Sequence, residues 1–269
     1  MNAITCRNVS VAYPPQRAPT LKEWALRRKR PAATQQFHAL KDVSFDVAQG
    51  DAFGIIGGNG AGKSTLLRVI AGIVPLTTGD VEVRGTVAPI IELGTGFDGE
   101  LSGRENIFFN GSLLGRSRAF VRARQAEIIE FAGISEFIDA PLRTYSTGMM
   151  ARLAFAIATT VGADIVLLDE VLAVGDSDFR SKCEKRIRGY HSAGATIVLV
   201  SHDMEAVRDL CSKAIWVDHG SVVAAGEAAS VVDAYEHRVR PARPAAIAPS
   251  PVSPSPREGG ERGEREAPG

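Results

Sequence analysis

The chain has 269 residues, and its 31 basic and 31 acidic side chains give a formal net charge of zero. A chain of this length suits one large domain or two small ones and can bury roughly 70–75% of its unfolded surface. Because the charge is balanced, no whole-molecule field points to nucleic acid, and no nucleic-acid partner is expected.

The cysteines and the apolar stretches indicate the cellular compartment of the protein. Cys6, Cys183 and Cys211 are odd in number, far apart and without metal-binding spacing, which is typical of reduced structural thiols in a cytosolic protein. No apolar stretch approaches the length of a membrane span, and the N-terminus lacks a charged-then-apolar signal pattern. Any membrane association is therefore expected to come through a partner or a surface patch.

The first predicted element is a strand that ends at Tyr13, and an unusual segment follows it. Residues 14–37, called the basic insert below, hold prolines around Leu21–Arg30, and six basic side chains against one acidic side chain give a local charge of +5. A solvated basic loop is compatible with this pattern. A short helix that contacts anionic lipid head groups or a membrane partner is equally compatible with it.

The next stretch is a glycine-rich loop between a strand, Asp51–Ile56, and a helix that is predicted to begin at Lys63. This phosphate loop follows the pattern Gly-x4-Gly-Lys-Ser/Thr, in which glycines turn backbone N–H groups inward and the helix N-terminus adds its positive dipole end. Lys63 is expected to neutralise the β- and γ-phosphates of a nucleotide, and the Ser64 hydroxyl to take one position on Mg²⁺. The alternative is a glycine turn that binds nothing. The candidate phosphate-binding residues are Gly57, Gly58, Asn59, Gly60, Ala61, Gly62, Lys63, Ser64 and Thr65.

A helical block is predicted in the middle of the chain. Valine and isoleucine residues between positions 81 and 91 predict two strands, after which the pattern becomes glycine-rich and then helical as far as position 160. A block of helices between two groups of strands is typical of a subdomain, and its expected bounds are about 93–160.

Carboxylates and a histidine follow the strands that come next. Apolar runs over 165–168 and 196–200 predict buried strands. Asp169 closes the first run and is expected to hold Mg²⁺ through its water shell, while Glu170 would polarise the attacking water as general base. His202, after the second run, would stabilise a γ-phosphate. Each residue type also occurs at strand ends for structural reasons alone, but their joint occurrence after a complete phosphate loop favours the catalytic interpretation.

Strands that alternate with helices around a phosphate loop predict an α/β fold, a P-loop NTPase with a mostly parallel core sheet and ligand sites at the carboxyl ends of its strands. The expected folded domain covers residues 1–240. Residues 241–269 contain seven of the fourteen prolines and almost no large apolar residues, so this tail is expected to be disordered.

With these residues in place, the chain resembles the nucleotide-binding subunit of an ATP-binding-cassette (ABC) transporter over roughly residues 3–235. The segment Tyr145–Met149 matches the family's signature loop, usually Leu-Ser-Gly-Gly-Gln, and keeps Ser146 and Gly148. The resemblance implies an ABC ATPase fold with an antiparallel β subdomain and an inserted helical subdomain. It also implies ATP and Mg²⁺ as cofactors and places Tyr13 against the adenine ring.

The resemblance further implies a homodimer, in which two copies close head to tail and Ser146 and Gly148 serve the nucleotide of the partner copy. Closure on ATP and opening after hydrolysis would drive a separate integral-membrane permease. The protein is therefore expected to lie peripherally on the cytoplasmic face of the cell membrane.

One departure from the family pattern bears on the substrate. Glu92 occupies the position of a glutamine that in the family contacts Mg²⁺ and the permease. The stretch 91–107, the signature loop and the basic insert together resemble the subfamily that exports cell-surface polysaccharides, namely O-antigen, capsule and teichoic acid. Two alternatives remain, a soluble ABC ATPase without a transport role and a regulatory nucleotide switch without turnover. Soluble members usually carry paired cassettes or long coiled-coil inserts, and neither is expected here.

Overall fold

The computed structural model describes residues 1–14, 36–91, 94–160, 162–169 and 176–239, and every statement below refers to these residues. Its strands are β1 (Asn2–Tyr13), β2 (Phe37–Ala48), β3 (Ala52–Ile56), β4 (Thr78–Val83), β5 (Val87–Ile90), β6 (Ile165–Asp169), β7 (Thr196–Val200), β8 (Lys213–Asp218) and β9 (Ser221–Glu227). Its α-helices are α2 (Lys63–Ile70), α3 (Gly103–Leu113), α4 (Arg118–Ala132), α5 (Thr147–Thr160), α6 (Ser177–Ser192), α7 (Met204–Leu210) and α8 (Ala228–Val239). Two short 3-10 helices are η1 (Ser135–Phe137) and η2 (Leu142–Thr144).

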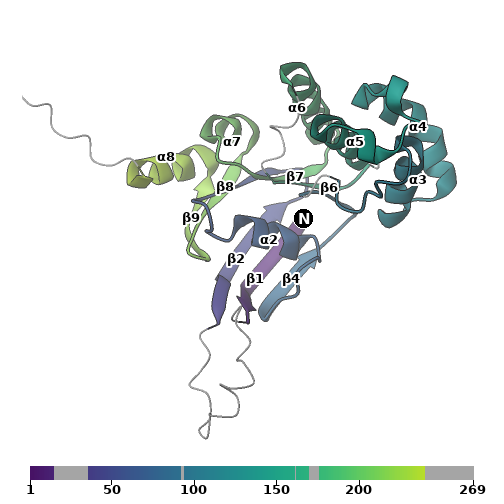
Figure 1. Ribbon diagram of the computed structural model, residues 1–269. Helices are drawn as coiled ribbons and strands as arrows, with labels where there is room; N and C mark the ends of the chain where they lie inside the picture. The colour runs from purple at the N-terminus through teal and green to yellow at the C-terminus, as the bar shows by residue number, and fades with distance from the viewer. Residues whose placement is uncertain (15–35, 92–93, 161, 170–175, 240–269) are drawn as a thin grey trace, which may run out of the picture.

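The centre of the molecule is a six-stranded sheet in the order β5-β6-β7-β3-β8-β9. Figure 1 labels its strands β6, β7, β8 and β9. The first five strands in this order run parallel, and β9 returns antiparallel to β8. Every residue of β3 and of β7 is buried. Both faces of these central strands are covered, which explains why their sequences are almost continuously apolar instead of alternating.

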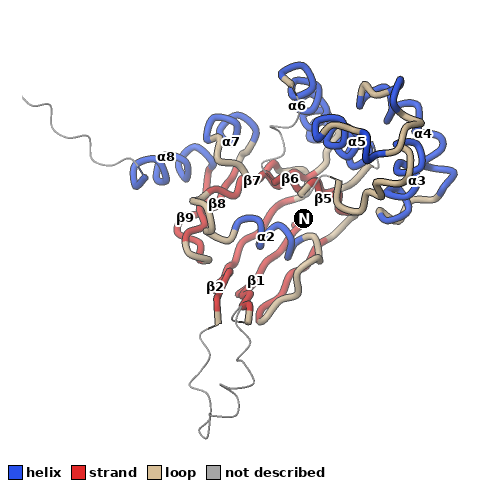
Figure 2. Tube along the Cα trace, viewed as in Figure 1, coloured by secondary structure: helices blue, strands red, loops and turns tan. Residues whose placement is uncertain are grey.

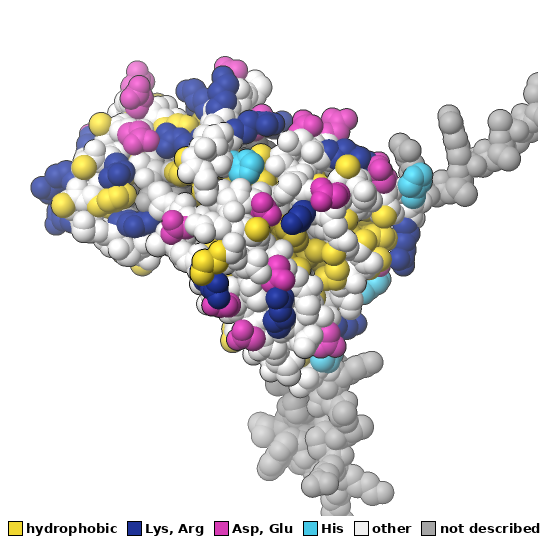
Figure 3. All heavy atoms as spheres, turned by 180° about the vertical axis from the view of Figure 1, so that it is seen from behind, with side chains coloured by type: hydrophobic (Ala, Val, Ile, Leu, Met, Phe, Trp, Pro, Cys, Tyr) yellow, Lys and Arg dark blue, Asp and Glu magenta, His cyan; other side chains and the backbone are white. Residues whose placement is uncertain are grey.

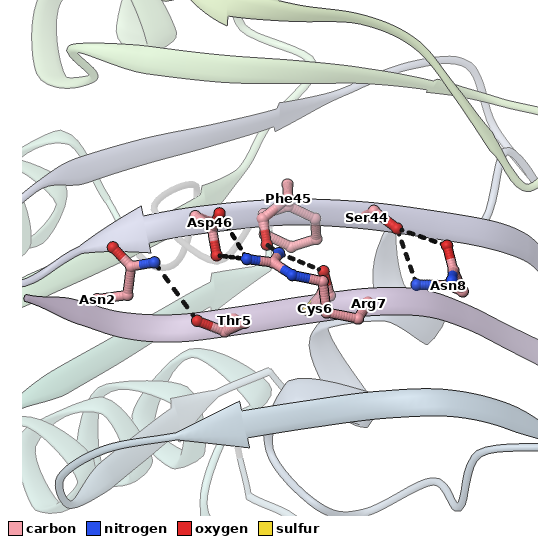
Figure 4. Close-up of polar contacts among 8 residues, drawn as sticks. All are labelled: Asn2, Thr5, Cys6, Arg7, Asn8, Ser44, Phe45 and Asp46. Carbon is pink, nitrogen blue, oxygen red and sulfur yellow. Dashed lines mark hydrogen bonds and ion pairs between the residues drawn. The ribbon is translucent and has the colours of Figure 1, made fainter.

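A smaller antiparallel sheet has the order β2-β1-β4. Arg7 on β1 reaches across to β2, where its Nη2 atom donates to both carboxylate oxygens of Asp46 at 2.8 and 2.9 Å (Figure 4). The Asn8 N–H donates to the Ser44 hydroxyl at 2.8 Å. These exposed contacts add little stability individually, but as cross-strand pairs they help to fix the register of the two strands.

The six-stranded sheet separates two hydrophobic cores, and Figure 2 shows α2 on one side of this sheet and α6 and α7 on the other. One core joins buried side chains of β1, β2 and α2 with one face of β3, β6, β7 and β8. The other core lies on the opposite face of the sheet, beneath α5, α6, α7 and α8. Because strand side chains alternate, Ile55 belongs to the first core and Ile56 to the second. The loop after β3 therefore leaves the sheet from a strand that is anchored on both faces.

The helices α3, α4 and α5 form a group with a core of its own, in which Ile107 and Leu153 are fully buried. Ser102 begins α3 with a capping box: its hydroxyl accepts the Glu105 N–H at 3.2 Å, and the Glu105 carboxylate accepts the Ser102 N–H at 2.8 Å. Figure 3 shows Lys and Arg side chains among hydrophobic ones at the end of the molecule that carries this group. The group lies between β5 and β6 along the chain, within the stretch 93–160.

All three cysteines are buried. Burial raises the pKa of the Cys6, Cys183 and Cys211 thiols to about 12 in each case. The thiols are therefore neutral at physiological pH and pack as small apolar groups.

The predicted α/β fold class, with a mostly parallel core sheet and a separate antiparallel sheet, is confirmed. The strand β2 begins at Phe37, inside the predicted bounds of the basic insert, whereas residues 15–35 lie outside the described residues. The predicted tail, 241–269, also lies outside them. Among the helices described, none is both long enough and apolar enough to cross a bilayer.

Candidate functional site

Two glycines set the path of the phosphate loop after β3. Gly57 adopts φ = 149°, and a Cβ atom there would collide with the carbonyl oxygen of Val217 on the neighbouring strand β8. Gly62 adopts φ = 108°, and a Cβ atom there would lie 2.5 Å from the carbonyl oxygen of Ala39. The backbone of the loop therefore approaches other strands more closely than any side chain permits. Glycine is required at these two positions by the fold itself.

Lys63 is the first residue of α2, and its ammonium group is held inside the loop. Its Nζ atom donates to the carbonyl oxygens of Gly57 and Gly58 at 2.9 and 3.0 Å, and the residue is 7% exposed. Gly62 precedes the helix in a left-handed conformation and has no side chain with which to cap the first turn. The backbone N–H groups of that turn and the positive end of the helix dipole therefore meet the ammonium group at one place, which suits an anionic ligand.

A cavity of about 410 Å³ opens at this loop. The loop and the start of α2 form one wall, two residues of β2 form another, and the last residue of β6 completes it. The structure thus brings Ser64 and Asp169, which are distant in the sequence, to the same cavity. The lining residues are Phe37, Ala39, Asn59, Gly60, Ala61, Gly62, Lys63, Ser64, Thr65 and Asp169.

Phe37 and Ala39 line the cavity from β2, and neither is predicted from the sequence. Phe37 is 65% exposed and pairs with Tyr13 across β1 and β2. Tyr13, which is predicted to contact adenine, is 38% exposed and is not among the described residues that line the cavity. The sequence signal for Phe37 is an aromatic residue directly before a stretch that alternates apolar and polar residues. Sequence reasoning misses this signal because the predicted basic insert, 14–37, includes position 37.

Ser146 and Gly148 stand at the start of α5 and are not among the described residues that line the cavity. The Ser146 hydroxyl accepts the Met149 N–H at 3.2 Å and so caps the helix. A Cβ atom on Gly148 would meet only the Ser146 Oγ atom, at 3.8 Å, among the residues described. No close approach within the described part of the subunit therefore calls for a glycine at this position.

Asp176 directly precedes α6 and forms an ion pair with α5. One of its carboxylate oxygens accepts the Phe179 N–H at 2.9 Å and caps the helix. The other forms an ion pair with Arg152 of α5, whose guanidinium carbon lies 5.4 Å from the centre of the Phe179 ring. The Phe179 N–H, together with the nearby Arg152 charge, holds the pKa of the Asp176 carboxyl below its ordinary value. Arg152 is not predicted as a site residue from the sequence.

The carboxyl ends of β6 and β7 bring Asp169 and His202 to the same edge of the sheet. Asp169 pairs in register with Val200, the last residue of β7, and the exposed His202 follows two residues later. Glu92 and Glu170, the remaining predicted site residues, lie outside the described residues. Within the described ranges, no group of three or more His, Cys, Asp or Glu side chains is arranged to hold a metal ion.

Comparison with known proteins shows the family to which the chain belongs. Residues 40–173 match the family model described as ABC transporter. The chain is 46% identical over 202 residues to the O-antigen export system ATP-binding protein RfbB of Klebsiella pneumoniae, and this alignment covers 75% of the chain and 82% of RfbB. The chain belongs to the ABC transporter family.

A second relative and a solved structure agree with this family assignment. The teichoic acids export ATP-binding protein TagH of Lactococcus lactis subsp. lactis (strain IL1403) is 41% identical over 206 residues, which cover 77% of the chain but 44% of TagH. The dimeric structure of an ATP-binding cassette in a post-hydrolysis state, bound to ADP and Pi, is similar with a TM-score of 0.67. That likeness covers 84% of this chain and 98% of the other at 21% identity. The predicted ABC ATPase fold is confirmed.

Proposed function

We propose that this ABC ATPase is the ATP-hydrolysing subunit of an exporter that moves a cell-surface polysaccharide or lipid-linked glycan across the cytoplasmic membrane through a separate permease. One observation carries the proposal: a 410 Å³ cavity unites the phosphate loop with Asp169 in a chain that is 46% identical to a protein named for O-antigen export. The relative TagH, named for teichoic acids export, supports the same class of cargo. O-antigen, capsule and teichoic acid are therefore the candidate polymers.

The triphosphate of ATP is proposed to occupy the loop side of the cavity. The ammonium group of Lys63 already lies inside the loop, so its charge is in place before the ligand enters. The first-turn N–H groups of α2 would donate to the phosphate oxygens. The adenine ring would pack against the aromatic pair at the β2 side of the cavity, where Phe37 lines the cavity and Tyr13 lies beside it.

Ser64 and Asp169 fit Mg²⁺. Their hydroxyl and carboxylate oxygens are the hard donors that this ion prefers, and both residues line the same cavity. Mg²⁺ usually takes the rest of its ligands from water and from the phosphates of the substrate, so a cage of three or more protein ligands is not required. When bound, the ion neutralises charge on the phosphates during phosphoryl transfer.

Glu170 and His202 are the proposed catalytic residues. Glu170 follows Asp169 directly and would accept a proton from the attacking water as general base. His202 follows the adjacent strand β7 and would stabilise the γ-phosphate from the neighbouring strand end. Both assignments depend on the position of Asp169 at the cavity, because neighbouring parallel strands end at the same edge of the sheet.

A homodimer is proposed to complete each nucleotide site. Ser146 and Gly148 would contact the γ-phosphate bound by the partner subunit, with the N-terminal dipole of α5 directed at it. The space around Gly148 supports this role, because a residue without close neighbours among the described residues of its own subunit leaves room for a ligand held by another. An isolated subunit would hydrolyse ATP poorly, since half of each site would be missing.

The permease is proposed to contact a groove beside the start of α5. This cavity of about 350 Å³ is lined by residues that follow Glu92, including Phe97, and by α5 residues, including Met150. Such contact would hold the protein peripherally on the cytoplasmic face of the membrane. The basic insert would add a contact with anionic lipid or with the permease, and the folded domain would end near position 240.

The test is to purify the protein from membranes of its native cell and to identify the membrane subunit that accompanies it. In cells that carry Lys63→Ala, the glycan should accumulate in the cytosol, and the purified variant should not hydrolyse ATP. Lys213→Ala is the matched control, because it removes a half-exposed lysine outside the cavity and should leave export intact.

The Glu170→Gln variant tests the proposed general base. Turnover should fall about 100-fold or more, while ATP still binds and the ATP-bound dimer persists longer. Full turnover would remove Glu170 from that role. ATP hydrolysis with no associated membrane protein and no glycan defect would indicate a soluble ABC ATPase. ATP binding without turnover by the unmodified protein would indicate a regulatory switch, and either result contradicts the export proposal.

A further inference from the structure

The turn between β8 and β9 contacts two separate walls of the nucleotide cavity. Gly220, in this turn, donates its N–H to the carbonyl oxygen of Ala61, inside the phosphate loop, at 2.9 Å. The carbonyl oxygen of Gly220 accepts the N–H of Lys41, on β2, at 2.8 Å. A single residue of the turn therefore links the phosphate loop to β2.

The same junction leaves no space for a side chain. Gly220 adopts φ = 84°, and a Cβ atom there would lie 2.8 Å from the carbonyl oxygen of Ala39 and 3.1 Å from its carbonyl carbon. A Cβ atom on Gly62 would approach the same oxygen to 2.5 Å and the Cα atom of Gly220 to 3.6 Å. The Ala39 carbonyl is therefore enclosed between two glycines. The phosphate loop, β2 and the β8–β9 turn meet at this carbonyl. A residue with a side chain at position 62 or 220 would push these backbone segments apart.

The distance between the phosphate loop and β2 at this junction sets the distance between two walls of the nucleotide cavity. Ala39 and Phe37 belong to the β2 wall, and Ala61 belongs to the loop wall. A nucleoside triphosphate has to reach both walls at once, with its phosphates at the loop and its base at Phe37. A bare phosphate chain needs the loop alone. A fixed distance between the two walls therefore favours the nucleoside triphosphate, because binding does not have to order the walls relative to each other.

We infer that Gly220 is a positioning residue: it fixes the distance between the phosphate loop and the Phe37 wall, and so makes the site selective for a complete nucleotide over a bare phosphate chain. The inference rests on the proposed ATP site. Gly220 is not among the described residues that line the nucleotide cavity, and it acts through the backbone of Ala61 and Lys41.

The experiment compares the binding of ATP and of inorganic tripolyphosphate to the full chain by titration calorimetry with Mg²⁺. Gly220→Ala should raise the Kd for ATP about tenfold, which matches the loss of base stacking, while tripolyphosphate binding stays at the wild-type level. Gly226→Ala is the matched control in the same hairpin. Gly226 also has a positive φ, 153°, but a Cβ atom there would meet no described residue within 4 Å, so both affinities should stay unchanged.

A second variant guards against misfolding of Gly220→Ala. His219→Gly adds no atom and loosens the same turn, whose residue 219 has φ = 47°, so it should shift the ATP affinity in the same direction by a smaller factor. An unchanged ratio of the two affinities in a variant that folds overturns the inference, whether both affinities fall or neither does. A wild-type protein that binds tripolyphosphate but not ATP would instead reject the ATP site, and this inference with it.

Discussion

Arg152 of α5 and Asp176, the residue before α6, form an ion pair. This pair joins two parts of one subunit that are proposed to act on different nucleotides. The helix α5 begins beside Ser146, which is proposed to serve the nucleotide of the other subunit. Asp176 follows the segment that contains Glu170, which is proposed to act on the subunit's own nucleotide. The pair therefore connects the two nucleotide sites of the proposed dimer through a single subunit.

Arg152→Ala should lower ATP turnover about tenfold, because α5 and α6 would lose this ion pair and the dimer would close with misplaced groups. The affinity of the isolated subunit for ATP should not change, since Arg152 does not line the cavity. Steady-state kinetics and equilibrium binding measure the two quantities separately. Arg104→Ala, which breaks the exposed pair with Asp139, is the control and should leave turnover intact. Equal turnover in both variants would contradict the proposed link.

Adjacent glycines of the phosphate loop should respond differently to substitution. Gly57→Ala should lower the free energy of unfolding by about 3 kcal/mol, because the residue has φ = 149° and its Cβ atom would collide with the Val217 carbonyl. Gly58→Ala should change it by less than about 0.5 kcal/mol, because a Cβ atom there would meet no described residue within 4 Å. Urea unfolding without nucleotide measures both. Similar stability of the two variants would show that the loop relaxes around Gly57.

The two aromatic residues at the β2 side of the cavity should contribute unequally to ATP binding. Phe37→Ala should raise the Kd for ATP about tenfold, as the loss of one base-stacking contact would. Tyr13→Ala should have a smaller effect, because Tyr13 pairs with Phe37 across the strands but is not among the described lining residues. Titration with ATP and with tripolyphosphate separates base contacts from a general loss of structure. A larger effect of Tyr13→Ala would assign the adenine contact to Tyr13, as the sequence predicts.

The phosphate loop can be predicted from the sequence because its strand, glycines and helix start are contiguous, and each follows from local backbone preference. Asp169 can be predicted to approach it, because it ends a buried strand and parallel strands end at a common edge. Phe37 and Gly220 cannot be found in this way. Their positions depend on the pairing of β1 with β2 and on the contact of the β8–β9 turn with the loop. Both are contacts between distant segments, which no local pattern records.

Asp164 should make the stability of the protein depend on acid pH. Its carboxylate accepts the Thr86 N–H at 2.7 Å and the Thr86 hydroxyl at 2.8 Å, and these bonds lower the pKa of the Asp164 carboxyl. Because the folded-state pKa lies below the unfolded value of about 3.9, the stabilisation is present above that pH and is lost as the pH falls through the folded-state pKa. Asp164→Asn cannot ionise and should lose less stability between neutral pH and pH values below about 4.

Chemical unfolding of both proteins across that pH range measures the difference. The pKa values of Glu105, Asp139 and Asp176 are also lowered, so the wild-type protein will lose stability from several groups. The difference between the two proteins is therefore the quantity that reports on Asp164. Parallel pH profiles would show that the bonds to Thr86 are no stronger in the folded protein than those to water.

Because all three cysteines are buried, an introduced cysteine can be labelled without first replacing the native ones. Maleimides and spin-label reagents react with the thiolate, and a pKa of about 12 leaves almost none of it at neutral pH. A cysteine introduced at an exposed position would therefore carry the label alone, without removal of Cys6, Cys183 or Cys211 from the cores that they help to fill. Distances between two such labels, one on each copy of the chain, would follow the opening and closing of the pair directly.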